Sequence, residues 1–472
     1  MIKLALPGGD LRGEAAKLLT SLGLHSGEYA NGSRSYRFPL AGEEAELRVF
    51  REKDIPIQIA LGNYDLGICN RVWLDELQAR FPQDQVVALC GFGFGGIDVV
   101  AATSPETLRD LGPVEDWGGT EGLRIVSEYP NLAEAFALGA RLPRYHIIPV
   151  WGAAGSYPPE DAELAVFADG GEVAQRLGLT AVACLATGSA SLLANRECLA
   201  RRDLSPVLAP LLKAAAPRDS SRLLRIPSVL QASGPRRQLS VREDGIVRLA
   251  LPDGHAQKHT FAALASAGFA FEGYGEKNAV SRPETGISGL VAKVIRPQDM
   301  PQHVAYGSFD LAITGRDWLL DHRIAFPSSP VREVADLRRS RYSLCAVVDE
   351  RLPYDGLAET IDYWHSHGRS VIRIASEYAN LADHFARQRH IGRYQIIPVS
   401  GASEGFVPED AEILIEGTET GTSVAANRLK VIDRIFESTN CVIARQSPLP
   451  GAAGELAASF LERLRGSVAV SA

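Results

Sequence analysis

A short loop of glycine and hydroxyl residues is the part of this sequence best suited to bind an anion. An apolar run ending at Ile415 predicts a buried strand just before the loop, and a helix is predicted to follow it. The candidate residues are Glu416, Thr418, Glu419, Thr420, Gly421, Thr422 and Ser423. Backbone N–H groups at such a turn, together with hydroxyl donors, can hold a phosphate. The alternative is a surface turn made of ordinary turn-forming residues.

The two carboxylates of this loop need a different interpretation. Glu416 and Glu419 carry negative charge and would repel a phosphate, so we expect them to bind ribose hydroxyls or a metal ion. Their spacing identifies no metal ligands, and the metal site stays unassigned. The loop therefore predicts an anion site with oxygen ligands beside it.

Composition limits the class of protein. A chain of 472 residues exceeds what one core usually supports, so several domains are expected. The hydrophobic fraction of 46% and the charged fraction of 22% are typical of soluble globular proteins, and a net charge of −8 gives no reason to expect nucleic acid as a partner. The sequence shows neither a secretory signal nor a membrane-length apolar run, which predicts a cytoplasmic protein without a membrane partner.

The six cysteines are scattered, without a CxxC pair or a histidine cluster. This spacing argues against a structural zinc site and a disulfide framework. Most of the cysteines are expected to be small buried apolar residues.

The chain repeats itself in order. The register is shown by four pairs of equivalent residues: Pro7 and Pro252, Asp65 and Asp310, Glu128 and Glu377, Asp161 and Asp410. The first two pairs are 245 residues apart and the last two are 249 apart, so the register holds over four separate blocks. We predict a first copy over residues 1–216, a linker over 217–245 that contains helix and strand breakers, and a second copy over 246–466.

Each copy alternates between predicted strands and helices. This order favours an α/β fold, in which ligands bind at the carboxyl ends of strands. Asp54 and Asp299 each precede an apolar residue and a proline, which predicts a helix start with an acidic N-cap. With about 215 residues, a copy is expected to form two lobes with a cleft between them.

Several of these blocks together resemble a known family. They are LALP at the start of each copy, Arg-x-x-Asp-Ile/Met-Pro, Asp-Leu-Gly/Ala-Ile, Tyr-Pro-Asn-Leu, the SGASE stretch (Ser400–Glu404) and the Glu-Thr-Gly-Thr loop. In this order they resemble the catalytic unit of ATP phosphoribosyltransferase, the first enzyme of histidine biosynthesis, duplicated in tandem. The resemblance implies two bilobal α/β units, each similar to type II periplasmic binding proteins.

The resemblance also implies an activity. Members of the family transfer phosphoribosyl from phosphoribosyl pyrophosphate to N1 of ATP, with Mg²⁺, and release pyrophosphate. Their Glu-Thr-Gly-Thr loop holds the 5-phosphate of the donor. The short form of the family works with a regulatory partner related to histidyl-tRNA synthetases, and neither copy here carries an obvious regulatory extension. A homo-oligomer, or a pseudo-dimer within one chain, is expected.

The two copies differ at the loop. Alignment with one gap places Gly171 opposite Gly421. The first copy then has Asp169, Gly170, Glu172 and Val173 where the second has Glu419, Thr420, Thr422 and Ser423. Phe167 replaces Glu416. Since a carboxylate replaces hydroxyl donors, we hypothesise that only the second copy binds the donor.

Other site residues follow from the resemblance, each with a structural alternative. Arg296 and its equivalent Arg51 match an arginine of the nucleotide and pyrophosphate site, or else cap a surface helix. Asp310 and Asp65 would hold a ribose or a cation, or be satisfied turn aspartates. Arg316 is expected to face the cleft and, with Arg296 and Asp310, to form the catalytic set.

Nucleotide-binding residues are expected at two places in the second copy. One is Asp253, Gly254 and His255, directly after LALP. The other is Glu377 with Tyr378, where the alternative is a carboxylate that caps the following helix. Contributions from the first copy are expected from Arg51 and Asp65.

The sequence departs from the family pattern after LALP. The family usually reads Lys-Gly-Arg there, whereas the copies read Gly8-Gly9-Asp10 and Asp253-Gly254-His255. Losing two cations should weaken a pyrophosphate site. Three possibilities stay open: an enzyme in which the first copy acts as an in-chain neighbour of the second, a non-catalytic paralogue that binds a nucleotide or phosphoribosyl ligand, and a small-molecule binding protein.

Overall fold

The computed structural model describes residues 1–24, 29, 36–39, 45–82, 85–112, 117, 122–142, 144–216, 245–275 and 280–470. The predicted linker falls on residues 217–244, outside the described residues, apart from residue 245. The chain forms two compact units, and each unit takes one lobe from each copy. Unit 1 contains Met1–Val99, Cys184–Leu224 and Cys345–Ile435, and unit 2 contains Val100–Ala183, Arg225–Leu344 and Phe436–Ala472.

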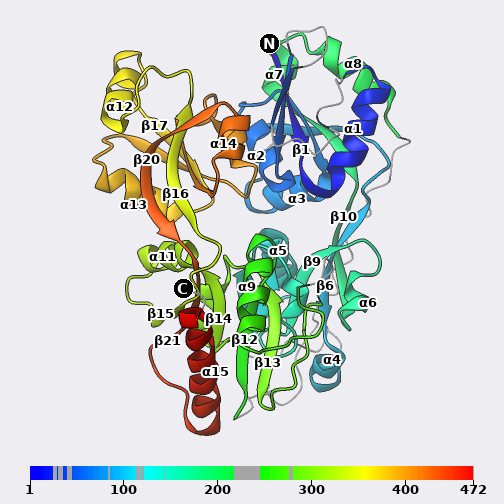
Figure 1. The fold of residues 1–472 in the computed structure, drawn as a ribbon. Helices are drawn as coiled ribbons and strands as arrows, with labels where there is room; N and C mark the ends of the chain where they lie inside the picture. The colour runs from blue at the N-terminus through cyan, green and yellow to red at the C-terminus, as the bar shows by residue number, and fades with distance from the viewer. Residues whose placement is uncertain are drawn as a thin grey trace. The chain divides into compact units, whose positions relative to one another are not determined.

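Both copies contribute helices and strands to unit 1 (Figure 1). The first copy contributes β1 (Ile2–Pro7), η1 (Gly9–Leu11), α1 (Arg12–Ser21), β2 (Arg37–Pro39), β3 (Ala45–Phe50), η2 (Glu52–Asp54), α2 (Ile55–Ala60), β4 (Leu66–Asn70), α3 (Arg71–Arg80), β5 (Val86–Gly91), β11 (Ala190–Asn195), α7 (Arg196–Arg201) and α8 (Ser205–Lys213). The second copy contributes α12 (Leu357–Ser366), β17 (Ile372–Ser376), α13 (Ala379–Gln388), β18 (Tyr394–Pro398), η5 (Ser403–Phe406), β19 (Ile413–Thr418) and α14 (Thr422–Ala426).

Unit 2 has the complementary composition. The first copy contributes α4 (Pro105–Leu111), β7 (Leu123–Ser127), α5 (Pro130–Gly139), β8 (Tyr145–Pro149), η4 (Ala154–Ser156), β9 (Leu164–Asp169) and α6 (Val173–Arg176). The second copy contributes β12 (Val247–Pro252), α9 (His255–Ser266), β13 (Leu290–Ile295), α10 (Met300–Tyr306), β14 (Leu311–Gly315), α11 (Arg316–Ala325), β15 (Val331–Asp336), β21 (Asn440–Arg445) and α15 (Gly451–Val470). The chain passes between the units within β6 (Ile97–Thr103), β10 (Thr180–Gly188), β16 (Tyr342–Asp349) and β20 (Leu429–Ser438).

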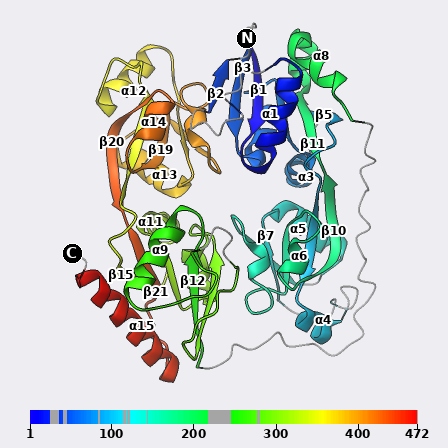
Figure 2. The ribbon, with the colours of Figure 1, turned by 45° about the vertical axis from the view of Figure 1, so that its right-hand side comes forward.

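The four sheets repeat in pairs, which confirms the α/β fold and the tandem repeat. The order β3-β1-β4-β11-β5 in unit 1, extended by β2, matches β13-β12-β14-β21-β15 in unit 2. The order β8-β7-β9-β6-β10 matches β18-β17-β19-β16-β20. Register is also kept, because Leu4 pairs with Leu66 as Leu249 pairs with Leu311. Helices α9 and α15 lie beside β12 in unit 2 (Figure 2).

Each unit is held together by an apolar core that both copies share. In unit 1 this core joins Phe50 and Ile55 of the first copy to Phe406 and Leu414 of the second. In unit 2 a second core joins first-copy residues such as Ala165 to second-copy residues such as Ile295. Burial of apolar surface between the copies is therefore the main force that assembles each unit.

Some predicted local features differ from the structure. Asp54 and Asp299 stand at the N-cap positions of α2 and α10, but neither side chain caps its helix. Three of the six cysteines, Cys69, Cys345 and Cys441, are buried, while Cys184 is exposed, so the expectation that most are buried was too broad.

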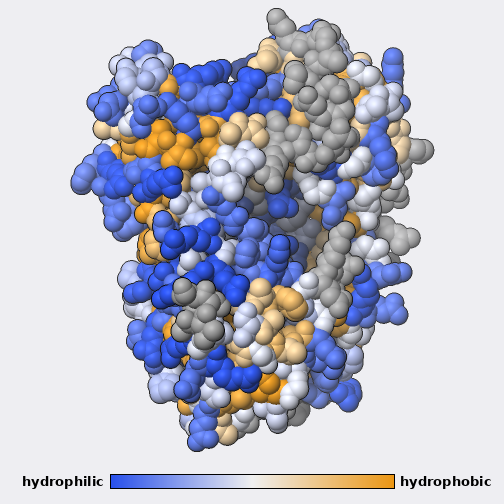
Figure 3. Space-filling model, in the orientation of Figure 1, coloured by the Kyte–Doolittle hydropathy of each residue, from blue (hydrophilic) through white to orange (hydrophobic). Residues whose placement is uncertain are grey.

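Within the described residues no helix is long and apolar enough to cross a membrane. Hydrophilic residues predominate on the face shown in Figure 3.

Candidate functional site

The loop of the second copy lies in unit 1, between β19 and α14. Thr418, the last residue of β19, accepts a hydrogen bond at Oγ1 from the backbone N–H of Gly421, at 2.9 Å. Gly421 has φ of 73°, a conformation that favours glycine. The hydroxyls of Thr420 and Thr422 lie 2.7 Å apart on exposed residues. The loop therefore presents hydroxyl groups and a glycine turn at its surface.

The loop of the first copy lies in unit 2, and one of its own carboxylates fills it. Asp169, the last residue of β9, accepts hydrogen bonds from the backbone N–H groups of Gly171 at 2.7 Å, Val173 at 2.9 Å and Ala174 at 3.4 Å. Burial raises the pKa of Asp169, but these backbone hydrogen bonds outweigh it, so the pKa falls below its usual value. The backbone N–H groups that could bind an external anion are already bonded to the carboxylate of Asp169.

This geometry corrects the sequence alignment by one residue. Asp169 and Thr418 both end their strand, and both accept from the N–H of the loop glycine. The equivalent of Asp169 is therefore Thr418 and not Glu419. The match of Phe167 with Glu416 keeps the same register along the strand.

Three carboxylates of the second copy gather beside its loop. Glu416 accepts hydrogen bonds from the hydroxyl of Ser403 and, at 3.1 Å, from the N–H of Gly417. Burial, followed by repulsion from Glu404 and Glu377, raises the pKa of Glu416 well above its usual value. Burial likewise raises the pKa of Glu377 to about 7. A cation or a proton would stabilise this cluster of Glu377, Glu404 and Glu416.

An arginine of the first copy reaches this acidic cluster. A Cβ added at Gly401 would come within 2.7 Å of Arg51 Nε and 3.1 Å of Glu377 Oε1, so both groups lie against the Gly401 backbone. Among the described residues, the Arg51 guanidinium forms no ion pair within 4 Å. Asp54 fixes the contact, because its Oδ2 accepts from the N–H of Ser400 at 3.1 Å. The first copy thus supplies a cation beside the loop of the second.

Unit 2 repeats this contact with one difference. A Cβ at Gly152 would come within 2.6 Å of Arg296 Nε, and Asp299 Oδ2 accepts from the N–H of Trp151 at 3.0 Å. Arg296, however, forms an ion pair with Asp253, with Nη1 and Oδ2 3.1 Å apart. Gly8 stands at the equivalent position in the first copy, so Arg51 meets no such carboxylate. Arg296 thus forms a close ion pair, whereas among the described residues Arg51 forms none within 4 Å, although it lies near Glu377.

The predicted aspartates make structural contacts. Asp65 accepts from the N–H of Lys3 at 2.8 Å and pairs with Arg202. Asp310 accepts from the N–H of Arg248 at 2.9 Å. Each precedes its strand, β4 or β14, and ties it to the neighbouring strand. These contacts are those of satisfied turn aspartates, and a role in binding substrate stays a prediction.

The remaining predicted residues have these places. Arg316 begins α11 and pairs with Glu333, with Nε and Oε2 2.7 Å apart. Tyr378 is the N-cap residue of α13, and its N–H donates to Ser376 Oγ at 2.9 Å, whereas neither Glu377 nor Ser376 caps the helix through its side chain. Gly254 precedes α9, which begins at His255. A binding role for Arg316 and these other residues stays a prediction.

The predicted set divides between the two units. Unit 1 holds the loop Glu416–Ser423 with Glu377, Tyr378, Arg51 and Asp65. Unit 2 holds Asp253, Gly254, His255, Arg296, Asp310 and Arg316. Sequence reasoning missed Glu404 as a member of the acidic cluster and Ser403 as a hydrogen-bond donor to Glu416, although both belong to the SGASE stretch that carried the family resemblance.

Comparison with known proteins agrees with the repeat. A curated ATP phosphoribosyltransferase from Chlorobium chlorochromatii is 32% identical over 214 residues, which is 43% of this chain and 66% of that protein. One from Thermodesulfovibrio yellowstonii is 29% identical over 206 residues, again 43% of this chain and 66% of that protein. The chain thus spans just under two thirds of the length of these relatives.

A solved structure and a family model were also matched. The ATP phosphoribosyl transferase (HisG:HisZ) complex from Thermotoga maritima covers 48% of this chain at 20% identity with a TM-score of 0.39, and all of its own chain is matched. The family model described as ATP phosphoribosyltransferase matches residues 51–213 and again residues 296–466. Since these two matches take up well over half of the sequence, the chain belongs to the ATP phosphoribosyltransferase family and carries its unit twice.

Proposed function

We propose that this protein transfers phosphoribosyl from phosphoribosyl pyrophosphate to N1 of ATP and releases pyrophosphate, as the first step of histidine biosynthesis. The observation that carries the proposal is the composition of unit 1. There the open loop of the second copy shares an acidic cluster with Arg51 of the first copy, while the first copy's own loop is filled by Asp169. The first copy would act as the in-chain neighbour that family members obtain from another subunit.

Each group of unit 1 has a chemical part in this proposal. The N–H groups and hydroxyls of Thr418–Ser423 would hold the 5-phosphate of the donor. The bond from ribose C1 to the pyrophosphate oxygen breaks and a bond from C1 to N1 of ATP forms, so negative charge builds on the leaving group. The unpaired guanidinium of Arg51 suits that charge.

The acidic cluster fits both ribose hydroxyls and Mg²⁺. Its donors are carboxylate oxygens, the ligands that Mg²⁺ takes together with substrate phosphates. Burial, and after it repulsion from Glu404 and Glu377, raises the pKa of Glu416, so a nearby cation would be stabilised there. Among the described residues Glu416, Glu404 and Glu377 do not converge closely enough to hold an ion by themselves, so substrate phosphates would supply further ligands, and the ion would neutralise pyrophosphate charge. We also propose that a regulatory subunit related to histidyl-tRNA synthetases binds this chain.

A second candidate function is favoured by one observation. Neither copy has a lysine or arginine directly after LALP, and in the second copy Asp253 occupies that place and pairs with Arg296. A site with fewer free cations stabilises a pyrophosphate leaving group less. A non-catalytic paralogue that binds the donor or a nucleotide is therefore the alternative.

The test is an assay for the adduct. The purified chain is incubated with ATP, phosphoribosyl pyrophosphate and Mg²⁺, alone and with a histidyl-tRNA-synthetase-like partner, and the ultraviolet absorbance of the product is followed. Adduct formation that is lost in Arg51→Gln supports the proposal. Tight donor binding by calorimetry without any adduct would replace it with the second candidate.

A further inference from the structure

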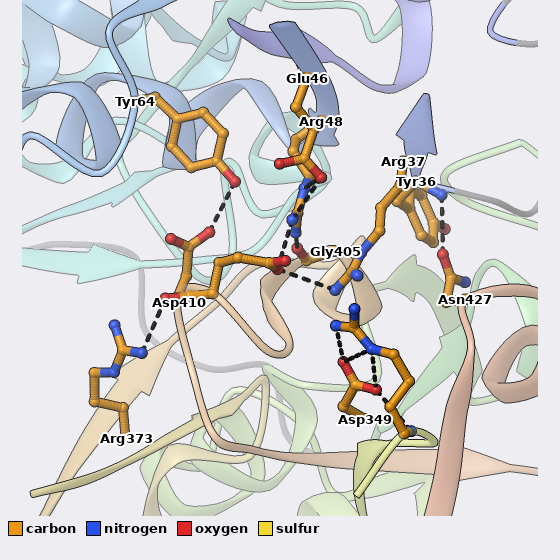
Figure 4. Close-up of polar contacts among 12 residues, drawn as sticks. Tyr36, Arg37, Glu46, Arg48, Tyr64, Asp349, Arg373, Gly405, Asp410 and Asn427 are labelled. Carbon is orange, nitrogen blue, oxygen red and sulfur yellow. Dashed lines mark hydrogen bonds and ion pairs between the residues drawn. The ribbon is translucent and has the colours of Figure 1, made fainter. Parts of the chain in front are cut away.

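The contact between the two copies in unit 1 is packed with polar side chains (Figure 4). Arg48, 1% exposed, has Nη2 2.8 Å from Glu46 Oε1, and its Nη1 donates to the carbonyl oxygen of Gly405 at 2.6 Å. The hydroxyl of Tyr64 donates to Asp410 Oδ2 at 2.8 Å. These groups bind one another across the packed contact, so they hold the two copies together.

Tyr36 of the first copy lies beside this packed contact, and its backbone is held on both sides. Its N–H donates to Asn427 Oδ1 of the second copy at 2.9 Å (Figure 4), and its carbonyl oxygen accepts from the N–H of Val49 at 3.0 Å. Asn427 is 2% exposed, and its Nδ2 donates to the carbonyl oxygen of Ser423 at 2.9 Å. Since Ser423 belongs to the loop of the second copy, Tyr36 is tied to that loop through one side chain.

The side chain of Tyr36 lies against the segment that carries Glu404. A Cβ added at Gly405 would come within 3.4 Å of Tyr36 Cβ, so the two residues are in contact. Glu404 directly precedes Gly405 in η5, and it belongs to the acidic cluster with Glu416. Among the described residues the Tyr36 hydroxyl forms no hydrogen bond. The first copy thus places an available hydroxyl next to the acidic cluster of the second.

The surroundings of Tyr36 keep this hydroxyl protonated. Burial, followed by repulsion from Glu404 and Glu416, raises the pKa of Tyr36 above its usual value, and the charges of Arg51 and Arg12 lower it only in part. A protonated phenol donates a hydrogen bond at neutral pH. The acidic cluster and Arg51 therefore both act on one hydroxyl, which is a donor.

Unit 2 has small or apolar residues at the equivalent positions. The repeat offsets and the ends of the loop helices give these equivalents: Ser281 for Tyr36, Gly155 for Glu404, Phe167 for Glu416 and Leu177 for Asn427. A Cβ added at Gly155 would clash with Leu177 and come within 3.5 Å of Phe167 Cε1, so apolar side chains fill this place. The tyrosine and the acidic cluster thus occur beside the open loop, and an apolar contact occurs beside the filled one.

The groups around Tyr36 match the chemistry of a sugar better than that of a phosphate. A 5-phosphate in the loop would bring the attached ribose next to Glu416, which lies on β19 just before the loop. A ribose hydroxyl can donate to a carboxylate and at the same time accept from a tyrosine O–H. A neutral phenol adds no charge for pyrophosphate, to which the guanidinium of Arg51 is better suited.

We propose that Tyr36 is a specificity-determining residue for the phosphoribosyl donor, supplied to the site by the first copy. Its hydroxyl donates to a ribose hydroxyl that itself donates to Glu404 or Glu416. The inference rests on the proposed function, because it names a further contact of the same site. It means that the first copy recognises the sugar of the donor as well as its leaving group.

The test measures the affinity of the whole chain for phosphoribosyl pyrophosphate with Mg²⁺ by calorimetry. Tyr36→Phe keeps the ring against Gly405 and removes only the hydroxyl, so the donor affinity should fall about tenfold, or about 1.4 kcal/mol. Ser281→Ala removes the hydroxyl at the equivalent position of unit 2 and should leave the donor affinity unchanged. The unfolding temperature of Tyr36→Phe should match that of the wild type, which shows that the variant is folded.

Pyrophosphate alone is the second ligand, because it lacks the ribose. Its binding should be the same in the wild type and in Tyr36→Phe, since the missing hydroxyl contacts the sugar. An equal loss of affinity for pyrophosphate and for the donor would overturn the assignment of Tyr36 to the ribose.

The outcomes separate this inference from the proposed function. If the wild type binds the donor and folded Tyr36→Phe binds it equally well, the inference is wrong and the proposed function stands. If the wild type binds the donor but forms no adduct, a tenfold loss in Tyr36→Phe still supports the contact while the proposed function gives way to the second candidate. A wild type that does not bind the donor would overturn both.

Discussion

The two loops after β9 and β19 begin from the same strand register and reach opposite chemical states. Thr418 Oγ1 accepts one backbone N–H and leaves the rest of the second copy's loop open, whereas the carboxylate of Asp169 accepts three in the first copy. In the first copy a carboxylate at the end of the strand accepts the N–H groups that an external anion would need. The loop glycine also stands two residues after Asp169 but three residues after Thr418, so the loops differ in length as well as in charge.

The equivalent arginines Arg51 and Arg296 also differ between the units. Arg51 and Arg296 lie against equivalent glycines, Gly401 and Gly152, but within the part of the chain that the structure describes Arg296 forms an ion pair, with Asp253, and Arg51 forms none within 4 Å. The open loop and the unpaired arginine thus occur together in unit 1, and the filled loop and the paired arginine occur together in unit 2. Each copy contributes one half of each combination.

Exchange of the strand-end residues should have the largest effect. In Thr418→Asp, the new carboxylate would accept the loop N–H groups and repel phosphate, so donor binding should weaken at least about 100-fold, roughly 3 kcal/mol. Calorimetry with phosphoribosyl pyrophosphate measures the donor affinity. The control is Asp169→Thr, which should leave donor affinity unchanged. Normal binding by Thr418→Asp would show that this loop does not hold the donor.

Substitution of the two arginines should give the second-largest effect, and the loss of activity should differ between the two units. Arg51→Gln should lower the rate of adduct formation about 100-fold, the usual size of a lost transition-state donor. Arg296→Gln should cost less than about tenfold, because Asp253 already neutralises a half-exposed guanidinium. Initial rates under saturating substrates give both values. Equal losses in the two variants would contradict the difference between the units.

A smaller effect is expected at the packed contact of unit 1. Tyr64 and Asp410 are 1% and 2% exposed, so Tyr64→Phe leaves a buried carboxylate oxygen without its donor. The expected loss is about 1–3 kcal/mol of stability, seen as a lower unfolding temperature. Phe309→Tyr is the matched change in unit 2 and should not lower stability by a comparable amount. A neutral Tyr64→Phe would mean that the hydrogen bond contributes nothing net.

The smallest effect is expected on the pH dependence of stability, compared between Glu377→Gln and the wild type. Burial raises the pKa of Glu377 to about 7, above its usual 4.5, so the folded chain binds this proton more tightly than the unfolded chain. Its contribution is complete below the unfolded value and is lost as pH rises through about 7. The unfolding temperature of Glu377→Gln should therefore fall less than that of the wild type as pH rises from 4.5 to 7.

Parallel pH curves for the two proteins would contradict this assignment. The comparison is needed because burial also raises the pKa of Glu52 to about 7 and of Asp54 to about 6 in the same unit. Glu52 contributes equally to both curves, because its causes do not include Glu377. Asp54 and Glu416 interact with Glu377, so the difference between the curves reports on Glu377 together with its effect on these two neighbours.

The sequence by itself determined the repeat, the α/β class and the family. These follow from local patterns, because apolar runs, glycine turns and motif order are properties of neighbouring residues. It also showed that the two loops differ, since the hydroxyl residues of 418–423 have no counterparts in the first copy. The repeat, the fold class, the family and the difference between the loops could all be predicted without the tertiary structure.

Only the tertiary structure decided which residues meet. Arg51 and Glu377 are far apart in sequence and meet because the two copies share an apolar core in unit 1. Asp54 and Asp299 have the sequence pattern of helix caps, yet they bind backbone N–H groups of the other copy. Long-range contacts of this kind depend on packing between distant segments, which no local pattern encodes.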